Sequence, residues 1–142
     1  MAADAWVLHD KAKQYMGDGT VDLDTNVLSI RLYSSTSNIA TTSVELPTNE
    51  LGTANGYTAG GKTLTGNDYV DASGTSTFDA TNPTAWTATG AGITARFAGI
   101  FDNTANTLIA HSLLDNTPAD VTATAGNTFA VEFNASGIFS GT

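Results

Sequence analysis

Residues 56–63 read GYTAGGKT, a complete match to the phosphate-binding loop pattern G-x-x-x-x-G-K-[ST], and the flanks of this stretch decide the fold. In a nucleotide-binding domain, the loop connects a buried strand to a helix whose N-terminus faces the phosphates. Here the upstream residues 47–55 are polar and turn-rich. The downstream residues 64–70 carry a Gly-Asn-Asp turn signal among β-favouring residues. The sequence therefore predicts a glycine-rich turn between two strands, with a phosphate-loop nucleotidase as the less favoured alternative.

The composition is that of one acidic domain without cysteine. A chain of 142 residues is large enough for a single domain, residues 1–142, with its own core. Its 5 Lys and Arg face 14 Asp and Glu, a formal net charge of −9, so we expect no nucleic-acid partner. Disulfides and thiolate chemistry are excluded because cysteine is lacking. The sequence shows neither a signal-peptide pattern nor an apolar stretch of membrane-spanning length, so we expect a soluble protein that is made in the cytoplasm and has no membrane partner.

One segment has helical periodicity. Apolar side chains recur at broadly helical spacing across residues 5–16, at Trp6, Leu8, Ala12, Tyr15 and Met16. Asp4 is a suitable N-cap, and the Gly-Asp-Gly of residues 17–19 ends the pattern. We therefore expect a short N-terminal helix over about residues 4–16.

The rest of the chain is patterned as short strands. Residues 26–33 alternate apolar Leu28, Ile30 and Leu32 with other side chains, which predicts a half-buried strand. Residues 93–102 lack strict alternation, so a central strand covered on both faces is expected there. Further strands are expected at residues 57–59, 62–65, 69–72, 76–80, 85–89, 107–113, 121–123, 128–133 and 137–139.

Short strands separated by Gly, Asn, Asp and Pro turns are typical of antiparallel architectures. We therefore expect a mainly β fold, an antiparallel β-sandwich or jelly-roll-like domain with one short N-terminal helix. The polar residues 34–55 are the candidate for a long, mobile loop. Long loops on β scaffolds often carry binding contacts.

Neither histidine, His9 or His111, lies in a recognisable nucleophile motif. We expect His9 on the helix surface beside Asp10. For His111 we expect a position in a strand, either facing outward or buried with one satisfied nitrogen. No residue is assigned a catalytic or cofactor-binding role, no cofactor is expected, and the chain is not expected to be an enzyme.

Four oxygen-bearing side chains are spaced so that they could converge on one cation: Asp18, Asp22, Asp24 and Asn26. Asp22-x-Asp24-x-Asn26 copies the start of a helix-loop-helix calcium loop. However, Val27 stands where that loop needs glycine, and Tyr33 stands where it needs a bidentate glutamate. The favoured interpretation is a polar turn whose Asp and Asn side chains bond their own backbone, and no metal ligand is assigned.

Several segments occur in an order that carries information. Residues 17–35 read GDGTVDLDTNVLSIRLYSS, residues 56–64 GYTAGGKTL, residues 93–101 ITARFAGIF, residues 108–113 LIAHSL and residues 129–139 FAVEFNASGIF. Read together, they resemble a family of small virion structural proteins of tailed bacteriophages. The corresponding segments of that family are similar to NGTxDLDTDTIKVALxTSS, GYTAGGxxL, ITARYAxIY preceded by a tryptophan (here Trp86), LIAxxxL and FxxxWNAxGIxxx. Phe133 replaces the tryptophan of the last motif, and Lys62 occupies a variable position.

The resemblance spans nearly the whole chain, implies a virion component and supplies no catalytic residues. The expected function is that of a capsid decoration, or cement, protein that binds the outside of the head and stabilises the capsid lattice. Its expected partners are the major capsid protein and copies of itself, as dimers or trimers on the lattice. The alternative is a tail-, collar- or fibre-associated adaptor or carbohydrate-binding module.

The candidate partner contacts are Trp6, Tyr15, Arg31, Arg96 and the loop at residues 34–55. Trp6 has an alternative role as a core residue that closes one end of the sandwich. Arg31 and Arg96 lie in predicted strands. They pair either with aspartates inside the fold or with an acidic capsid surface.

Overall fold

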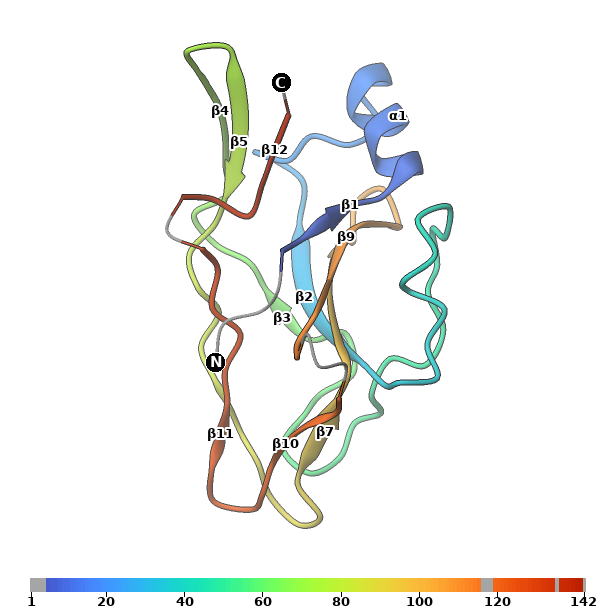
Figure 1. The fold of residues 1–142 in the computed structure, drawn as a ribbon, viewed down its shortest axis with the longest axis vertical. Helices are drawn as coiled ribbons and strands as arrows, with labels where there is room; N and C mark the ends of the chain where they lie inside the picture. The colour runs from blue at the N-terminus through green and yellow to red at the C-terminus, as the bar shows by residue number, and fades with distance from the viewer. Residues whose placement is uncertain (1–4, 116–118, 135, 142) are drawn as a thin grey trace.

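The computed structural model describes residues 5–115, 119–134 and 136–141, and it consists mainly of antiparallel strands (Figure 1). The largest sheet has the strand order β1-β9-β8-β2-β3, and the smaller sheets are β12-β5-β4, β11-β6 and β10-β7. The elements are β1 (Val7–Leu8), α1 (Asp10–Asp18), β2 (Leu28–Tyr33), β3 (Lys62–Thr63), β4 (Asp68–Ala72), β5 (Thr75–Asp79), β6 (Trp86–Thr87), β7 (Ile93–Ala95), β8 (Phe97–Asp102), β9 (Thr107–Leu113), β10 (Val121–Ala123), β11 (Thr128–Phe129) and β12 (Phe139–Gly141). The predicted fold class, mainly β and sandwich-like with one short helix in the described part of the chain, is confirmed.

The main core lies between the large sheet and the smaller sheets. Leu28, Ile30 and Leu32 of β2 enter it from one side, where they are fully buried. Aromatic side chains of the smaller sheets enter from the other side and form ring pairs: Phe78 with Phe139 at 5.2 Å, and Trp86 with Phe129 at 6.5 Å between ring centroids. Burial of this apolar surface is the largest stabilising contribution that the fold offers.

The opposite face of the large sheet is covered by residues 34–55, which we call the excursion. Ile39 from the excursion is fully buried against Tyr33, Phe101 and Leu108 in a second, smaller cluster. Figure 1 shows the excursion (teal) running beside β2 and β9 on the side away from the smaller sheets. As a result β2, predicted to be half-buried, is covered on both faces, and that prediction is wrong.

The predicted helix over residues 4–16 begins too early. Val7 and Leu8 form β1 instead, paired antiparallel with His111 and Ala110 of β9. This pairing gives the segment backbone hydrogen bonds and packs Leu8 against the main core, which outweighs a weak helical preference. The helix α1 starts after His9, the N-cap, and ends at Gly19, whose left-handed φ of 86° suits glycine.

The predicted strand over residues 93–102 is divided at Arg96 into β7 and β8. The backbone of Arg96 donates to Tyr33 O at 2.9 Å and accepts from Leu114 N at 3.0 Å. The chain enters the large sheet at this point, and β7, which precedes Arg96, pairs with β10 instead. The expectation of a strand covered on both faces is confirmed for β8.

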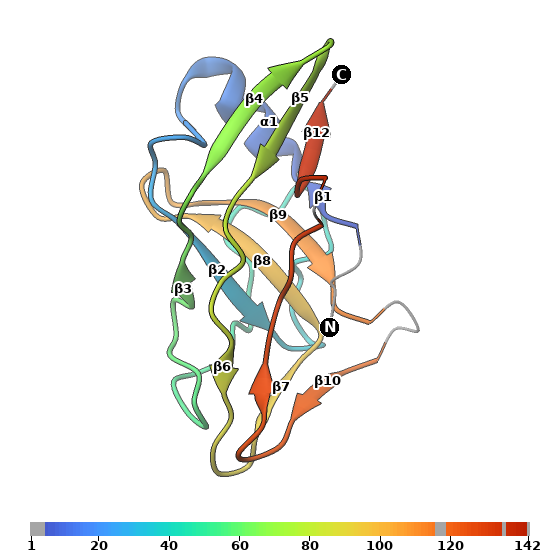
Figure 2. The same ribbon diagram turned by 90° about the vertical axis from the view of Figure 1, so that its left-hand side faces the viewer.

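The two ends of the molecule carry different elements (Figure 2). The helix α1 and the β4–β5 hairpin lie at one end, and β6, β7, β10 and β11 lie at the other. Ser73 and Gly74 join β4 to β5, and both have positive φ, 54° and 83°, as a two-residue hairpin turn requires.

Candidate functional site

Trp6 lies in the stretch before β1 rather than on a helix. Its ring centroid is 5.8 Å from that of Phe133, and the half-buried side chain packs against the main core. Together with Leu8, Ile138 and Phe139 it borders a hollow of about 610 Å³. Trp6 therefore packs on the main core through Phe133, and its side chain stays half-buried.

Tyr15 connects α1 to the excursion. Its hydroxyl donates to Glu45 Oε1 at 2.7 Å, and Lys11 Nζ lies 5.5 Å from the centre of its ring. The hydrogen bond to Glu45 raises the pKa of Tyr15. A second connection joins the same two segments, since Thr42 Oγ1 donates to Asp10 Oδ2 at 2.9 Å and Asp10 N donates to Thr42 O. The helix and the excursion therefore form one continuous surface.

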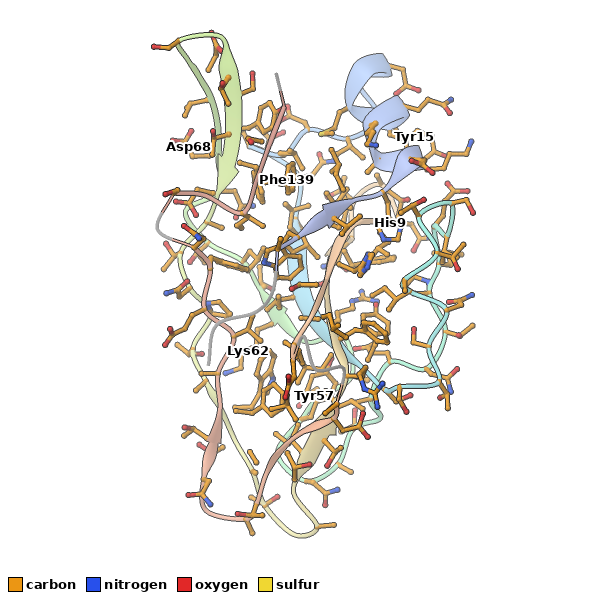
Figure 3. All side chains as sticks on the ribbon, viewed as in Figure 1. His9, Tyr15, Tyr57, Lys62, Asp68 and Phe139 are labelled. Atoms are coloured by element: carbon orange, nitrogen blue, oxygen red, sulfur yellow. The ribbon has the colours of Figure 1, made fainter. Side chains whose placement is uncertain are left out.

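His9 is not a surface residue, which corrects the expectation from the sequence. It is fully buried between β1 and the excursion (Figure 3), and its Nε2 lies 2.7 Å from His111 Nδ1. Its Nδ1 lies 3.2 Å from Val44 O, and because a carbonyl can only accept, Nδ1 carries the proton. Nε2 of His9 then accepts from Nδ1 of His111. His111 is thus buried with one satisfied nitrogen, the second of the two expected alternatives.

Burial disfavours the charged form of both rings. It lowers the pKa of His9, and it lowers the pKa of His111 to about 4, with His9 adding a repulsive contribution. Asp10 opposes the shift at His9 and Lys13 adds to it. The pair is therefore neutral at pH 7, and its role at that pH is to anchor the excursion.

Arg31 contacts several side chains of its own chain. Its guanidinium lies 3.7 Å from Glu50 Oε2, donates to Asn103 Oδ1 at 2.7 Å, and stands 4.0 Å from the centre of the Phe101 ring. Arg96 pairs with Asp120, with 2.8 Å between Nε and Oδ1. Both arginines therefore have a carboxylate partner inside the fold, a glutamate for Arg31 and an aspartate for Arg96.

The 56–63 turn has none of the context of a nucleotide site. It leads into β3 rather than into a helix. Lys62 Nζ donates to Thr84 Oγ1 at 2.8 Å and to Ala85 O at 3.1 Å, and it lies 5.3 Å from the centre of the Trp86 ring. The ammonium that would bind phosphates is thus bound to groups of its own chain. The predicted glycine-rich turn is confirmed together with the strand that follows it, β3, whereas residues 57–59, the strand expected before it, form only an isolated bridge between Tyr57 and Ala54.

Tyr57 and Glu50 organise the start of this turn. The Tyr57 hydroxyl donates to Glu50 Oε1 at 2.8 Å and accepts from Leu32 N at 3.1 Å. Gly60 N donates to the same carboxylate oxygen. The role of Glu50 was not predicted from the sequence, although glutamate is rare in this chain and could have drawn notice. Two of the three Glu lie in the excursion, and each accepts a hydrogen bond from a tyrosine.

The four candidate cation ligands are used separately. Asp22 Oδ1 accepts from Asp24 N and Thr25 N, and Asp18 Oδ1 accepts from Thr20 N, as expected for polar turns. Asp24 Oδ1 accepts from Tyr69 N at 2.7 Å, and Asn26 Nδ2 donates to Asp102 Oδ2. Within residues 5–115, 119–134 and 136–141, no group of three or more His, Asp or Glu side chains is gathered closely enough to hold a metal ion.

Comparison with known proteins places the chain in no family: no family model, no curated protein and no solved structure matches it. Among the described residues, no helix is long and apolar enough to cross a membrane.

Proposed function

We propose that this chain is a structural protein of a tailed-phage virion, a capsid decoration protein that binds the outside of the head and stabilises the capsid lattice. The observation that carries the proposal is the ordered set of motifs that resembles small phage virion proteins. In the fold, these motifs supply β2, β3, β8 and β9 of the large sheet and the aromatic residues of β11 and β12. The resemblance therefore covers the segments that build the core rather than scattered surface turns.

The surface best suited to a lattice contact is formed by α1 and the excursion. The bonds of Tyr15 to Glu45 and of Asp10 to Thr42 fix these two segments to each other. Leu46, next to Glu45, is 58% exposed. Its apolar side chain is therefore available for the buried centre of a contact with a partner.

Arg31 and Arg96 differ as candidates for contact with the capsid. The side chain of Arg96 is 27% exposed and that of its partner Asp120 is 42% exposed, so the pair is accessible from outside. Arg31 is occupied by three groups of its own chain. Arg96 is therefore the better candidate of the two for a contact that exchanges an internal carboxylate for one of the partner.

Stabilisation of a shell by such a protein depends on copy number. Each copy bridges neighbouring capsomers, and copies that meet at a symmetry axis of the lattice form dimers or trimers. Because the shell holds the copies in place, individual contacts of modest strength add up to a strong collective restraint.

The alternative is a tail-, collar- or fibre-associated adaptor or carbohydrate-binding module, and a carbohydrate-binding module would need a different kind of surface. Sugar-binding surfaces present exposed aromatic rings. The large apolar side chains that are exposed in the described residues are Val7, Val27, Leu46 and Val70, none of them aromatic. This distribution favours the decoration role over a carbohydrate-binding module.

Immunogold labelling of purified virions tests the proposal. Antibody against this chain is applied to particles of the phage that encodes it. Label spread evenly over the head is the expected result, and heads assembled without the protein are expected to break at lower temperature. Label confined to the tail or to one vertex would support the adaptor alternative, and particles without label would overturn the virion role.

A further inference from the structure

A hollow of about 590 Å³ lies where the end of α1 meets β4. Its walls include Lys13, Met16, Val21, Asp22, Asp24 and Tyr69. Val21 is buried, whereas Met16 and Tyr69 are half-buried and leave apolar surface open. The lining residues come from α1, from the segment that follows it and from β4, and Figures 1 and 2 show α1 and the β4–β5 hairpin at the same end of the molecule.

The rim of this acidic hollow carries negative charge from two sources. Asp22 and Asp24 are exposed, and each has one oxygen fixed by a backbone amide, so the carboxylates are held in position. The hollow also faces the C-terminus of α1, whose last turn has no basic residue to offset the negative end of the helix dipole. The one cation in the walls, Lys13, is paired with Asp10 at 3.6 Å.

A second copy of this chain is a poor occupant, because it has few cations and most of them are already engaged; Arg96, whose ion pair is accessible, is the exception. Arg31 is paired with Glu50, Arg96 with Asp120, and Lys62 with Thr84 and a backbone carbonyl. Lys11 and Lys13 remain, and both lie on α1 itself. With a net charge of −9, two copies would bring like charges together at this end.

We infer that the acidic hollow receives a segment of a different protein that carries Lys or Arg beside apolar residues. The cation lies against Asp22, Asp24 and the helix end, and its aliphatic stem lies on Met16 and Tyr69. If the proposed function is right, that protein is the capsid subunit, and this identification rests on the proposed function. The affinity of the hollow for a cationic and apolar segment does not depend on the proposed function.

The first experiment probes the chemistry alone. The peptide acetyl-Leu-Arg-Leu-Arg-amide is titrated into the isotope-labelled protein, and backbone amide shifts are followed by NMR. Saturable shifts confined to residues 13–24 and to Tyr69 are expected, and they weaken as salt is raised, because the rim is exposed. Acetyl-Leu-Glu-Leu-Glu-amide is the control. Shifts spread over the whole acidic surface, or equal shifts with the Glu peptide, would overturn the inference.

Gly17 offers a variant that fills the hollow without disturbing the fold. It lines the hollow, and a Cβ placed on it meets no atom within 4 Å. In Gly17→Leu the added side chain occupies the space, and leucine favours the helix more than glycine does. Peptide affinity is expected to fall about tenfold or more. Thr128→Leu is the matched control, since Thr128 is exposed on β11 at the opposite end of the molecule, and the variant should bind as the unaltered protein does.

A charge variant and a head-binding assay complete the test. Asp22→Asn with Asp24→Asn keeps an acceptor oxygen for each backbone amide and removes the charge, so peptide binding should weaken. A small loss of unfolding free energy is expected as well, because the hydrogen bonds to Asp22 favour its charged form. Expanded heads lacking the protein are then mixed with the unaltered protein and with Gly17→Leu. If the peptide fills the hollow but neither protein binds heads, the proposed function fails and the inference stands. If both bind heads equally well, the hollow is not the capsid contact. The assignment of its occupant to the capsid subunit then fails, the peptide titration alone decides the chemistry of the hollow, and the proposed function stands.

Discussion

His9 Nε2 and His111 Nδ1 lie 2.7 Å apart, although 102 residues separate them in the chain. The pair is buried beneath the excursion and connects β1, β9 and Val44 through one line of hydrogen bonds. When both rings are neutral, one proton lies between them, and His111 Nδ1 donates it to His9 Nε2. Two protonated rings would place N–H against N–H, so acid must weaken this contact.

The unfolding free energy is expected to fall as pH falls from 6.5 to about 4. In the unfolded chain both histidines titrate near 6.5, whereas burial lowers the pKa of His9 and lowers that of His111 to about 4. The unfolded state therefore takes up protons first, and stability that is fully present above pH 6.5 is lost across this interval. The expected loss is about 2–3 kcal/mol, measured by urea unfolding followed through tryptophan fluorescence.

His111→Gln is the control for the pH effect. The glutamine amide can still donate to His9 Nε2, but one titrating ring is gone, so the slope between pH 6.5 and 4 should shrink. The carboxyls of Asp18 and Asp22, whose pKa values are lowered by their hydrogen bonds with Thr20 and Thr25, add to the slope only at the acidic end of this interval, and they do so equally in both proteins. A variant with the full slope of the unaltered protein would contradict this role of the pair.

Two adjacent glycines of the 56–63 turn are expected to differ sharply on replacement by alanine. Both Gly60 and Gly61 have positive φ, 95° and 69°, and both variants carry that strain. A Cβ on Gly60 meets nothing within 4 Å, but one on Gly61 would stand 1.8 Å from Ile30 O. Gly60→Ala should cost about 1–2 kcal/mol of unfolding free energy, and Gly61→Ala at least about 3 kcal/mol, as measured by urea unfolding. Equal losses would show that the close approach to β2 is not what requires glycine.

The Tyr57 hydroxyl is expected to stabilise the fold, whereas the Tyr69 hydroxyl is not. Tyr57→Phe leaves Leu32 N without its acceptor and takes a donor from Glu50, which should cost about 1–3 kcal/mol. Tyr69→Phe removes a hydroxyl from a half-buried ring on β4 and should change stability by less than about 0.5 kcal/mol. Thermal unfolding by circular dichroism compares the two. Similar melting temperatures for both variants would contradict the role assigned to Tyr57.

Much of the fold follows from local patterns, and the remainder depends on contacts between distant residues. β9 and β10 have the predicted bounds, because continuous β-favouring runs end at clear turn residues. The predicted strand at residues 57–59 is wrong. Tyr57 forms only an isolated bridge with Ala54, and its buried hydroxyl bonds Leu32 N and Glu50. The strand expected at residues 128–133 is β11 alone, although the alternation of buried Phe129, Val131 and Phe133 is confirmed.

The contacts of the candidate site depend even more on residues that are far apart in the sequence. No spacing in the sequence brings His9 to His111 or Glu45 to Tyr15. The first contact needs β1 paired with β9, and the second needs the excursion folded back over the sheet. The helix start was missed for the same reason, since β1 exists only where β9 pairs with it. The glycine-rich turn, by contrast, was predictable because its flanks contradicted the phosphate-loop motif locally.

Arg31 and Arg96 are expected to separate structural from binding roles. Arg31→Ala breaks contacts with Glu50, Asn103 and the Phe101 ring, and it should cost about 2–4 kcal/mol of unfolding free energy. Arg96→Ala breaks one accessible ion pair and should cost less than about 1 kcal/mol. Urea unfolding of both variants gives these values. The comparison needs no partner, so it stands apart from the proposed function.

Head binding then assigns the role of Arg96. A stable Arg96→Ala variant that binds expanded heads several-fold more weakly than the unaltered protein would place Arg96 in the capsid contact. Asp120→Asn is the matched control, because it weakens the same ion pair but leaves the cation free for a partner, and it should bind heads at least as well as the unaltered protein. If both variants lose binding equally, the ion pair serves only to hold β10 against the Arg96 backbone, and Arg96 is not a contact residue.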